Sequence, residues 1–152
     1  MSSDSSVPYS KTLEIRDRCL CLHAQRAARG LARRFDEAFR PLGINNGQFS
    51  LMISLNRPEP PTLGSVARLL GMDRTTLTAK LKPLERRGWV TVAVDGKDKR
   101  GRRLSLTPEG YAVLADAEPI WRATHDAVDA DLAGEALGQG RDALYAGLRA
   151  LA

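Results

Sequence analysis

The sequence has little of what secreted, membrane-spanning or metal-binding proteins need. Its 152 residues include only two cysteines and two histidines, which is too few for a disulfide framework and lacks the spacing of a zinc site. The longest apolar run, near residues 49–55, is far too short to cross a bilayer. Residues 1–10 are rich in serine and lack the basic start and apolar core of a signal peptide. We therefore expect a cytoplasmic protein without a membrane segment, a metal or another cofactor, and a disordered tail over residues 1–10.

The sequence also lacks the motifs that mark common enzymes. It contains no recognisable nucleophile–base pair, no glycine-rich loop that could cradle a phosphate, and no metal-ligand spacing. The hydrophobic content of 43% and the charged content of 27% are ordinary for a folded protein. A chain of this length forms one compact domain, or a small domain with an attached helical framework. We expect a binding protein rather than an enzyme.

What the sequence does contain is a helix pair followed by a charged hairpin. Thr62 can cap a first short helix, and Asp73 can cap a second helix that ends at Gly88. Two strands, over 89–94 and 102–106, follow with a basic turn between them. This order predicts a winged helix-turn-helix, in which the second helix enters the DNA major groove. The predicted fold class is mainly α with a small β-hairpin wing (α+β).

Positive charge is concentrated in this segment. Residues 74–103 hold ten Lys or Arg and three Asp or Glu, a formal charge of +7, whereas the whole chain carries +5. Residues 108–152 hold three Arg and eight Asp or Glu, which makes that segment acidic at −5. A basic patch confined to one module is the electrostatic footprint of nucleic-acid binding, and a solvated lysine-rich surface is the plainer alternative. We expect double-stranded DNA as a partner.

The segments on both sides of the winged unit are expected to be helical. From about Thr12 to Phe39, apolar residues recur every three or four positions, and Pro41 follows as a stop signal. After the hairpin, Thr107 can cap a long helix that has Pro108 at its first position. One face of that helix is expected to carry Tyr111, Leu114, Trp121, Thr124, Val128 and Leu132, and a last helix presents Leu137, Leu144, Leu148 and Leu151.

The apolar stripes of these outer helices need a partner. They form either the core of one chain or a contact between two chains, and a helix-turn-helix unit normally reads DNA as a two-fold dimer. We therefore expect a homodimer. Residues 11–42 and 108–152 are assigned to a helical dimerisation region, and residues 44–107 to the winged helix-turn-helix DNA-binding region.

Three motifs resemble the MarR family of winged helix-turn-helix transcriptional regulators. They are Leu-Leu-Gly-Met-Asp-Arg-Thr-Thr-Leu-Thr over 69–78, Leu-Glu-Arg-Arg-Gly-Trp-Val over 84–90, and Asp-Lys-Arg-Gly at 98–101 followed by Leu-Ser-Leu-Thr-Pro-Glu-Gly over 104–110. The last carries the family's wing signature, Asp-x-Arg followed by Leu-Thr-x-x-Gly. The resemblance covers roughly residues 12–150. It implies a dimer on a palindromic operator, which is often released by a small aromatic ligand or by oxidation.

The second helix of the pair supplies the first group of candidate DNA contacts. Helical spacing directs Leu77, Leu81 and Leu84 toward the core, so the opposite side faces outward. Threonine can offer a hydroxyl to a base edge or phosphate and a methyl group to thymine, and arginine can bind guanine with two hydrogen bonds. The threonines could instead be a capping segment behind Asp73. Pro83 should kink the helix. The candidates are Arg74, Thr75, Thr76, Thr78, Lys80 and Lys82.

The wing supplies the second group. Basic side chains crowded into one tight turn repel each other unless a polyanion lies beside them, and a narrow minor groove favours arginine. The resemblance implies that Asp98 pairs with Arg100 and stiffens this loop. Arg102 and Arg103 go beyond the family's usual pattern and are expected to add phosphate affinity. The candidate contacts are Lys97, Lys99, Arg100 and Arg102.

Two alternative sensing sites are considered. Trp121, Arg122 and His125 could form an effector pocket, because an aromatic ring beside a cation can hold an aromatic carboxylate. Trp121 is otherwise plain core. On this basis we expect release by a small aromatic or phenolic ligand. A winged-helix module that binds other proteins is a further alternative, and it would not need the basic wing.

Cys21 is the candidate for sensing by oxidation. It resembles the reactive cysteine of the peroxide-sensing branch of the same family, which would make the protein an oxidative-stress regulator. That branch surrounds its cysteine with tyrosines, whereas the corresponding positions here are Gln25, Phe35 and Asn46. Cys19 and Cys21 are expected on nearly opposite sides of one helix, where a bond between them is geometrically poor. We expect an ordinary, buried thiol.

Overall fold

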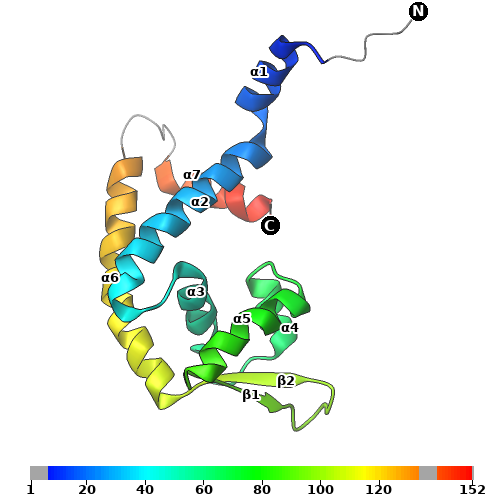
Figure 1. Ribbon diagram of the computed structural model, residues 1–152, viewed down its shortest axis with the longest axis vertical. Coiled ribbons are helices and arrows are strands. Elements are labelled where there is room, and N and C mark those ends of the chain that lie inside the picture. The colour runs from blue at the N-terminus through cyan, green and yellow to red at the C-terminus, as the bar shows by residue number, and fades with distance from the viewer. Residues whose placement is uncertain (1–6, 134–139, 152) are drawn as a thin grey trace, which may run out of the picture. The chain divides into compact units, whose positions relative to one another are not determined.

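A computed structural model describes residues 7–133 and 140–151. It divides into two compact units, Met1–Arg34 and Phe35–Ala152, which are described separately. The chain is mostly helical with one antiparallel hairpin, as Figure 1 shows, and this confirms the predicted fold class. In chain order the elements are α1 (Tyr9–Arg18), α2 (Leu20–Phe39), the short 3₁₀ helix η1 (Arg40–Leu42), α3 (Asn46–Leu55), α4 (Leu63–Leu69), α5 (Arg74–Arg86), β1 (Val90–Val94), β2 (Arg102–Leu106), α6 (Pro108–Leu132) and α7 (Gly140–Ala150).

The first unit is made of α1 and most of α2, where we had expected a single helix. The two are separated at Cys19, whose backbone is extended (φ −73°, ψ 101°). The Cys19 sulfur then accepts a hydrogen bond from the N–H of Leu22, at 3.4 Å, and so serves the first turn of α2. α1 begins at Tyr9, so Tyr9 and Ser10, which were assigned to the disordered tail, are helical. Residues 1–6 lie outside the described part of the chain.

The second unit is built around a core shared by α3, α4, α5, the hairpin and α6. The three leucines of α5 that were expected to face inward, Leu77, Leu81 and Leu84, are at most 1% exposed. β1 and β2 pair in register from Val90 opposite Leu106 to Val94 opposite Arg102. The last part of α2 belongs here as well, because Phe35 and Phe39 are buried in this core.

Capping residues fix where the helices of this unit begin. Asn45 forms a reciprocal capping box with Gln48 at α3, and Thr62 accepts from the N–H of Ser65 at α4. Thr107 accepts from the N–H of Gly110 at α6, with Pro108 in the first position. At the C-terminal ends of α4 and α5 the glycines have positive φ, 62° at Gly71 and 72° at Gly88. The boundaries predicted at Thr62, Gly88, Thr107 and Pro108 are confirmed.

The residues that the long helix α6 buries differ in part from those predicted. Leu114 and Val128 are buried as expected, whereas Tyr111 is 45% exposed. The buried positions of the first turns are Gly110, Leu114 and Ala117, and Tyr111 lies to one side of that row. Leu137 lies outside the described residues. Within residues 7–133 and 140–151, no helix is both long enough and apolar enough to cross a membrane.

Candidate DNA-binding surface

The N-terminal end of α5 is built on the carboxylate of Asp73. This carboxylate accepts from the N–H of Thr76 at 2.8 Å and from the Thr76 hydroxyl at 2.6 Å. These hydrogen bonds, led by that of the hydroxyl, hold the pKa of Asp73 below its ordinary value. The hydroxyl proton of Thr76 is therefore used within the helix, and only its oxygen lone pairs remain for an outside donor. Thr76 has the capping role that was the alternative interpretation of these threonines.

The neighbouring candidates at this end of α5 are exposed. The Thr78 hydroxyl donates to the carbonyl oxygen of Arg74 at 2.7 Å, so it too can only accept from outside, whereas its methyl group stays available. Thr75 is exposed. The Arg74 guanidinium lies against α4, since a Cβ added to Gly64 would be 3.0 Å from Arg74 Nη2. A glycine at that position leaves room for the arginine.

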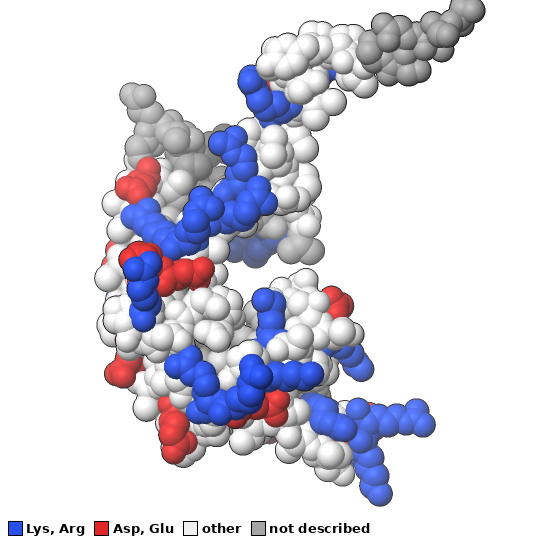
Figure 2. All heavy atoms as spheres, viewed as in Figure 1, with Lys and Arg blue, Asp and Glu red and all other residues white. Residues whose placement is uncertain are grey.

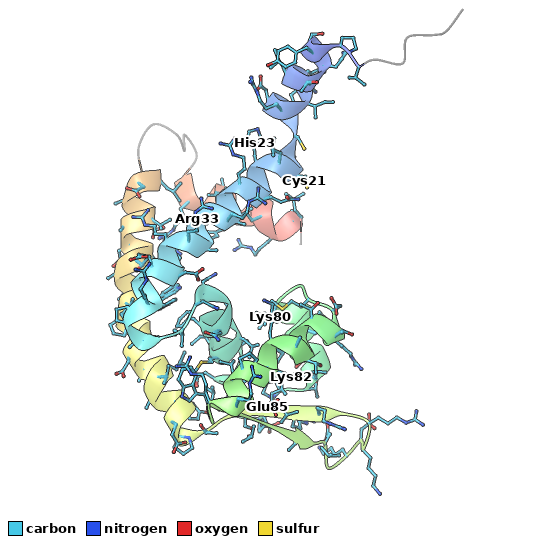
Figure 3. The ribbon with its side chains drawn as sticks, in the orientation of Figure 1. Cys21, His23, Arg33, Lys80, Lys82 and Glu85 are labelled. Atoms are coloured by element: carbon cyan, nitrogen blue, oxygen red, sulfur yellow. The ribbon has the colours of Figure 1, made fainter. Side chains whose placement is uncertain are left out.

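The two lysines of α5 do not share one face. Both Lys80 and Lys82 are exposed, and Figure 3 labels them along the helix. At 3.6 residues per turn they lie about 160° apart around the axis. Lys82 is on the side opposite Leu77, Leu81 and Leu84, whereas Lys80 is at the flank. Arg86, which is exposed and shares the side of Lys82, was not among the predicted contacts.

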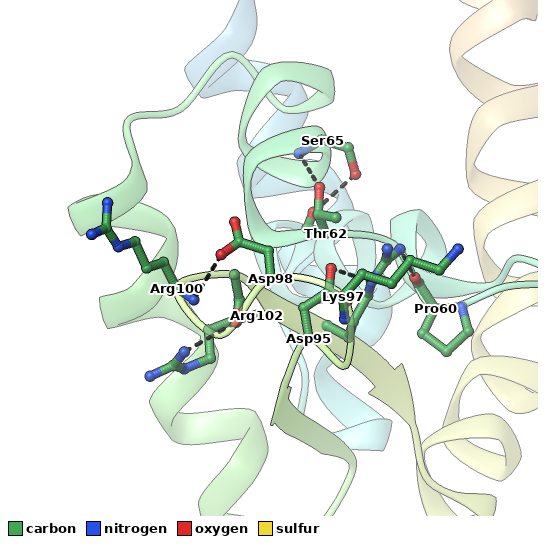
Figure 4. Close-up of polar contacts among 10 residues, drawn as sticks. Pro60, Thr62, Ser65, Asp95, Lys97, Asp98, Arg100 and Arg102 are labelled. Carbon is green, nitrogen blue, oxygen red and sulfur yellow. Dashed lines mark hydrogen bonds and ion pairs between the residues drawn. The ribbon is translucent and has the colours of Figure 1, made fainter.

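The tip of the wing is a hydrogen-bonded turn that presents basic side chains. Asp98 Oδ1 accepts from the N–H of Arg100 at 2.9 Å, and the N–H of Gly101 donates to the Asp98 carbonyl at 2.8 Å (Figure 4). Asp98 thus engages Arg100 through its backbone, and the guanidinium of Arg100 is left exposed. Arg102 Nη1 donates to the carbonyl of Gly101 at 3.0 Å. Lys97 and Lys99 complete the exposed basic tip.

The base of the wing is anchored by an ion pair that the sequence did not reveal. Arg103 Nε donates to Asp95 Oδ2 at 2.9 Å, and Arg103 Nη1 donates to the carbonyl of Pro60 at 3.0 Å. Asp95, only 8% exposed, also accepts from the N–H of Lys97 at 3.0 Å. That N–H and Arg103 hold the pKa of Asp95 below its ordinary value. The expectation that Arg103 adds phosphate affinity is corrected, because its guanidinium is used to tie the wing to the loop before α4.

These elements bring the predicted contacts to one region of the second unit. Figure 2 shows Lys and Arg side chains gathered over α5 and the hairpin. Many exposed basic residues elsewhere have an acidic partner close in sequence, such as Arg122 with Glu118 on α6. Among the described residues, no ion pair involves Arg74, Lys82 or Arg100. Uncompensated positive charge on a helix and an adjacent wing is what a polyanionic ligand requires.

Comparisons with known proteins agree with this geometry. A profile of the MarR family matches residues 44–101. The Mycobacterium tuberculosis regulator MosR, solved in complex with DNA, is 33% identical, with 88% of this chain and 93% of that chain covered and a TM-score of 0.77. The Bacillus subtilis regulator YwoH is 31% identical over 93 residues, covering 61% of this chain and 67% of its own. This chain belongs to the MarR family.

A third relative is longer than this chain. The Escherichia coli repressor MprA is 29% identical over 120 residues, which are 78% of this chain and 65% of MprA. The chain thus spans just under two thirds of that relative's length. MarR-family proteins are transcriptional regulators and not enzymes, so the expectation of a protein that is not an enzyme is confirmed. The match over 44–101 lies inside the segment that was predicted to bind DNA.

The residues proposed for an effector pocket in this MarR-family chain are only partly together. The rings of Trp121 and His125 are 4.9 Å apart, and Trp121 also stacks on Phe49 at 6.4 Å. His125 Nε2 lies 3.2 Å from the hydroxyl of Tyr145 on α7. Arg122 is separate from them, because it lies on the exposed side of α6 with Glu118.

A different cation is found next to His125. Asp129 Oδ2 lies 3.6 Å from His125 Nδ1 and is paired with Arg141 at the start of α7. The other oxygen, Asp129 Oδ1, is buried and has no hydrogen-bond partner among the described residues. Sequence reasoning missed Asp129, Arg141 and Tyr145, since the helices that carry them are adjacent only in the folded chain. Trp121 and His125 are therefore parts of a polar and aromatic cluster that joins α6 to α7.

The exposure of Cys21 differs from the prediction of a buried thiol. Its thiol is exposed within the first unit instead of buried, because it lies in the first turn of α2 just after the break at Cys19. Gln25 Nε2 donates to its sulfur at 3.1 Å. Gln25 stands at one of the positions that correspond to tyrosine in the peroxide-sensing branch. Within the part of the chain that the structure describes, no group of three His, Cys, Asp or Glu residues could hold a metal ion.

Proposed function

We propose that this chain is a transcriptional repressor that binds a palindromic DNA operator as a homodimer. The observation that carries the proposal is the uncompensated basic surface made by the outward side of α5 and the wing tip. MosR and the repressor CouR, which is 26% identical with a TM-score of 0.75, have both been solved with DNA. The name of MprA describes a repressor. These likenesses support the DNA-binding role and the direction of regulation.

The proposal of a homodimer is based on large apolar side chains that are exposed in each of the two units. In the first unit Ile15 is 61% exposed and Leu20 is 72% exposed. Leu148 on α7 is 49% exposed, and Leu151, just after that helix, is 73% exposed. Side chains of this size are usually covered in a soluble protein when they cluster on one helix face. Residues 11–42 and 108–152 form the helical dimerisation region in this proposal. Residues 44–107 form the DNA-binding region.

Release of the operator is assigned to a small aromatic or phenolic ligand. The supporting observation is the cluster of Trp121, His125 and Tyr145, which offers ring faces and a hydroxyl close together. It joins α7, in the proposed dimerisation region, to the core of the DNA-binding region through Phe49. A ligand that displaced one ring would change the link between those two regions.

The decisive experiment separates the role of α5 from that of the wing. A preferred DNA site is first selected from a random library, and its affinity is measured over a range of salt concentrations. Alanine at Arg100 and Arg102 should weaken binding to all sequences and flatten the salt dependence, by about 0.9 in slope for each phosphate that is no longer neutralised. Alanine at Thr75 or Arg74 should relax discrimination at particular base pairs by roughly 1–3 kcal/mol.

Arg122→Ala is the matched control for the removal of one arginine. Its guanidinium is exposed and paired with Glu118 on α6, so DNA affinity and salt dependence should not change. Sedimentation of the wild-type protein should give a dimer at micromolar concentration. A chain that selects no sequence and is not retained by DNA at moderate salt would contradict the proposal, and would favour a winged-helix module that binds proteins.

A further inference from the structure

A second group of basic side chains lies outside the surface described above, on α2. Arg26, Arg29 and Arg33 recur at spacings of three and four, which places them within about 60° of one another around the helix axis. All three are exposed. Figure 2 shows Lys and Arg side chains along this helix, and Figure 3 labels Arg33 on it. We call Arg26, Arg29 and Arg33 the arginine stripe.

The acidic residues nearest to the arginine stripe along α2 are engaged with other groups, because Asp36 accepts from the N–H of Asn46 and Glu37 pairs with Arg40. From Leu20 to Arg34 the sequence contains four arginines and no Asp or Glu. Arg29 donates to the side-chain oxygen of Gln25, at 3.5 Å, and no ion pair of the three stripe arginines occurs among the described residues. Like charges at these spacings destabilise a helix. The stripe therefore has a cost in the free protein that an anionic partner would remove.

The neighbouring helix of the same unit provides the contrast. In α1, Lys11 and Arg18 both pair with Glu14, at 2.8 and 3.2 Å, and Arg16 pairs with Asp17 at 2.6 Å. Three basic residues there are thus compensated locally. In α2, by contrast, Arg26, Arg29 and Arg33 occur in no ion pair among the described residues. The same holds for Arg74 and Lys82 of α5 and for Arg100 of the wing tip. The two regions share the same electrostatic property, although they belong to different units.

The stripe is also on the side of α2 that a dimer contact would leave free. Ala24, Ala28, Leu31 and Phe35 lie on roughly the opposite side of the helix. An apolar side that packs against another helix leaves the arginines directed away from that contact. The use of α2 in a homodimer and the use of its arginine stripe are therefore compatible.

We propose that the arginine stripe of α2 is a second binding surface for the DNA phosphate backbone, in addition to α5 and the wing. The inference rests on the proposed function. α2 carries arginine and no lysine, and the planar guanidinium of arginine can bind phosphate oxygens with two hydrogen bonds. From Arg26 to Arg33 the helix rises about 10 Å, which corresponds to about three phosphates of one strand at 3.4 Å of axial rise each.

Anionic lipid is the competing partner for a basic amphipathic helix. Helices that insert into a membrane surface carry large apolar side chains such as Trp, Phe and Leu on the other side. The side of α2 opposite the stripe carries Ala24, Ala27 and Ala28 together with Leu20, Leu31 and Phe35, and Phe35 is already buried in the core of the second unit. Alanine offers little area for insertion. The composition of the helix therefore favours a phosphate backbone over a lipid surface.

The test compares two variants of the full chain from which the same charge has been removed within the same unit. In the stripe variant Arg26, Arg29 and Arg33 are all replaced by glutamine, and in the control variant Lys11, Arg16 and Arg18 are replaced by glutamine. Affinity for the selected duplex is measured between low and moderate salt. The stripe variant should show a flatter salt dependence, by about 0.9 in slope for each phosphate that is no longer neutralised, with unchanged base preference. The control variant should match the wild type.

Circular dichroism and sedimentation of both variants verify that helix content and oligomeric state are retained. Replacing the three arginines by lysine should restore most of the salt dependence, because the charge is kept. If the stripe variant binds DNA like the wild type while the Arg100 and Arg102 variant does not, the inference is wrong and the proposed function stands. If the stripe variant loses only binding to phosphatidylglycerol vesicles, the partner is lipid. A wild-type chain that binds no DNA refutes the proposed function itself.

Discussion

Gly110 lies where the first turn of α6 passes the backbone of Trp89. A Cβ at this position would overlap the Trp89 carbonyl oxygen and would be 3.0 Å from its carbonyl carbon. That carbonyl is fixed, because it accepts from the N–H of Thr107 at 3.0 Å. We expect Gly110→Ala to destabilise the protein by about 1–3 kcal/mol or more, since neither backbone segment can yield without breaking the start of α6. Urea unfolding measures the change.

Gly147→Ala is the control for this prediction. Gly147 is inside α7 with ordinary helical backbone, and no atom lies within 4 Å of an added Cβ. Alanine there should stabilise the protein by roughly 0.5–1 kcal/mol, because glycine loses more backbone entropy on folding. If both alanine variants changed stability in the same direction, the close approach at Trp89 would not be the reason that glycine occupies position 110.

The ion pair of Asp95 with Arg103 leads to a prediction about how the stability of the protein depends on pH. Its pKa is below the ordinary value of 3.8 in the folded protein, first because of the Lys97 N–H and also because of Arg103. A carboxyl whose pKa is lowered by folding stabilises the folded state above its unfolded pKa, and this contribution is lost as the pH falls through the folded pKa. Wild type should therefore exceed Asp95→Asn in urea midpoint by a constant amount from pH 8 to about 5.

Below the ordinary pKa of 3.8 the two urea midpoints should converge, because the carboxylate of Asp95 becomes protonated in the folded protein. Asp98→Asn provides a comparison at the tip of the same wing, where the carboxylate is more exposed and accepts from the N–H of Arg100. The difference in urea midpoint between the wild type and Asp95→Asn could instead disappear already near pH 6. The stabilisation would then depend on the titration of another group, such as a histidine.

At the scale of the elements, local signals predicted the fold of the winged unit. Thr62, Asp73 and Thr107 cap their helices with side chains that reach only three residues along the chain, so spacing alone predicts them. The break between α1 and α2 has no such signal. Cys19 is neither glycine nor proline, and the apolar spacing continues across it, so one long helix was the natural expectation.

Interactions between distant residues explain what the sequence did not show at the candidate site. Arg103 was interpreted as one more cation of the wing, but the register that places Arg103 opposite Ala93 brings it to Asp95 and to the Pro60 carbonyl. In the same way Arg122 was grouped with Trp121 because they are adjacent in sequence. Adjacent residues of a helix point about 100° apart, and the cation near His125 is Arg141 of the Asp129 pair.

At the scale of the whole molecule, the remaining question is how DNA binding is switched. Sensing by oxidation would require that a change at Cys21 moves the dimerisation region and thereby the spacing of the two α5 helices. Cys21 is exposed, so its oxidised forms can be hydrated by solvent. The amide of Gln25 donates to its sulfur at 3.1 Å. Sensing by a ligand at Trp121 and His125 requires no change at the thiol.

We therefore expect hydroperoxide at modest excess to leave affinity for the selected DNA site unchanged, even where mass spectrometry shows that Cys21 has been oxidised. The measurement compares the wild type, Cys21→Ser and Cys19→Ser before and after treatment. Cys19→Ser is the control for the other thiol, which accepts from the Leu22 N–H and is less exposed. Loss of binding in the wild type and in Cys19→Ser, with binding retained in Cys21→Ser, would identify Cys21 as the sensor. The ligand-release part of the proposed function would then give way to regulation by oxidation, with the DNA-binding part unaffected.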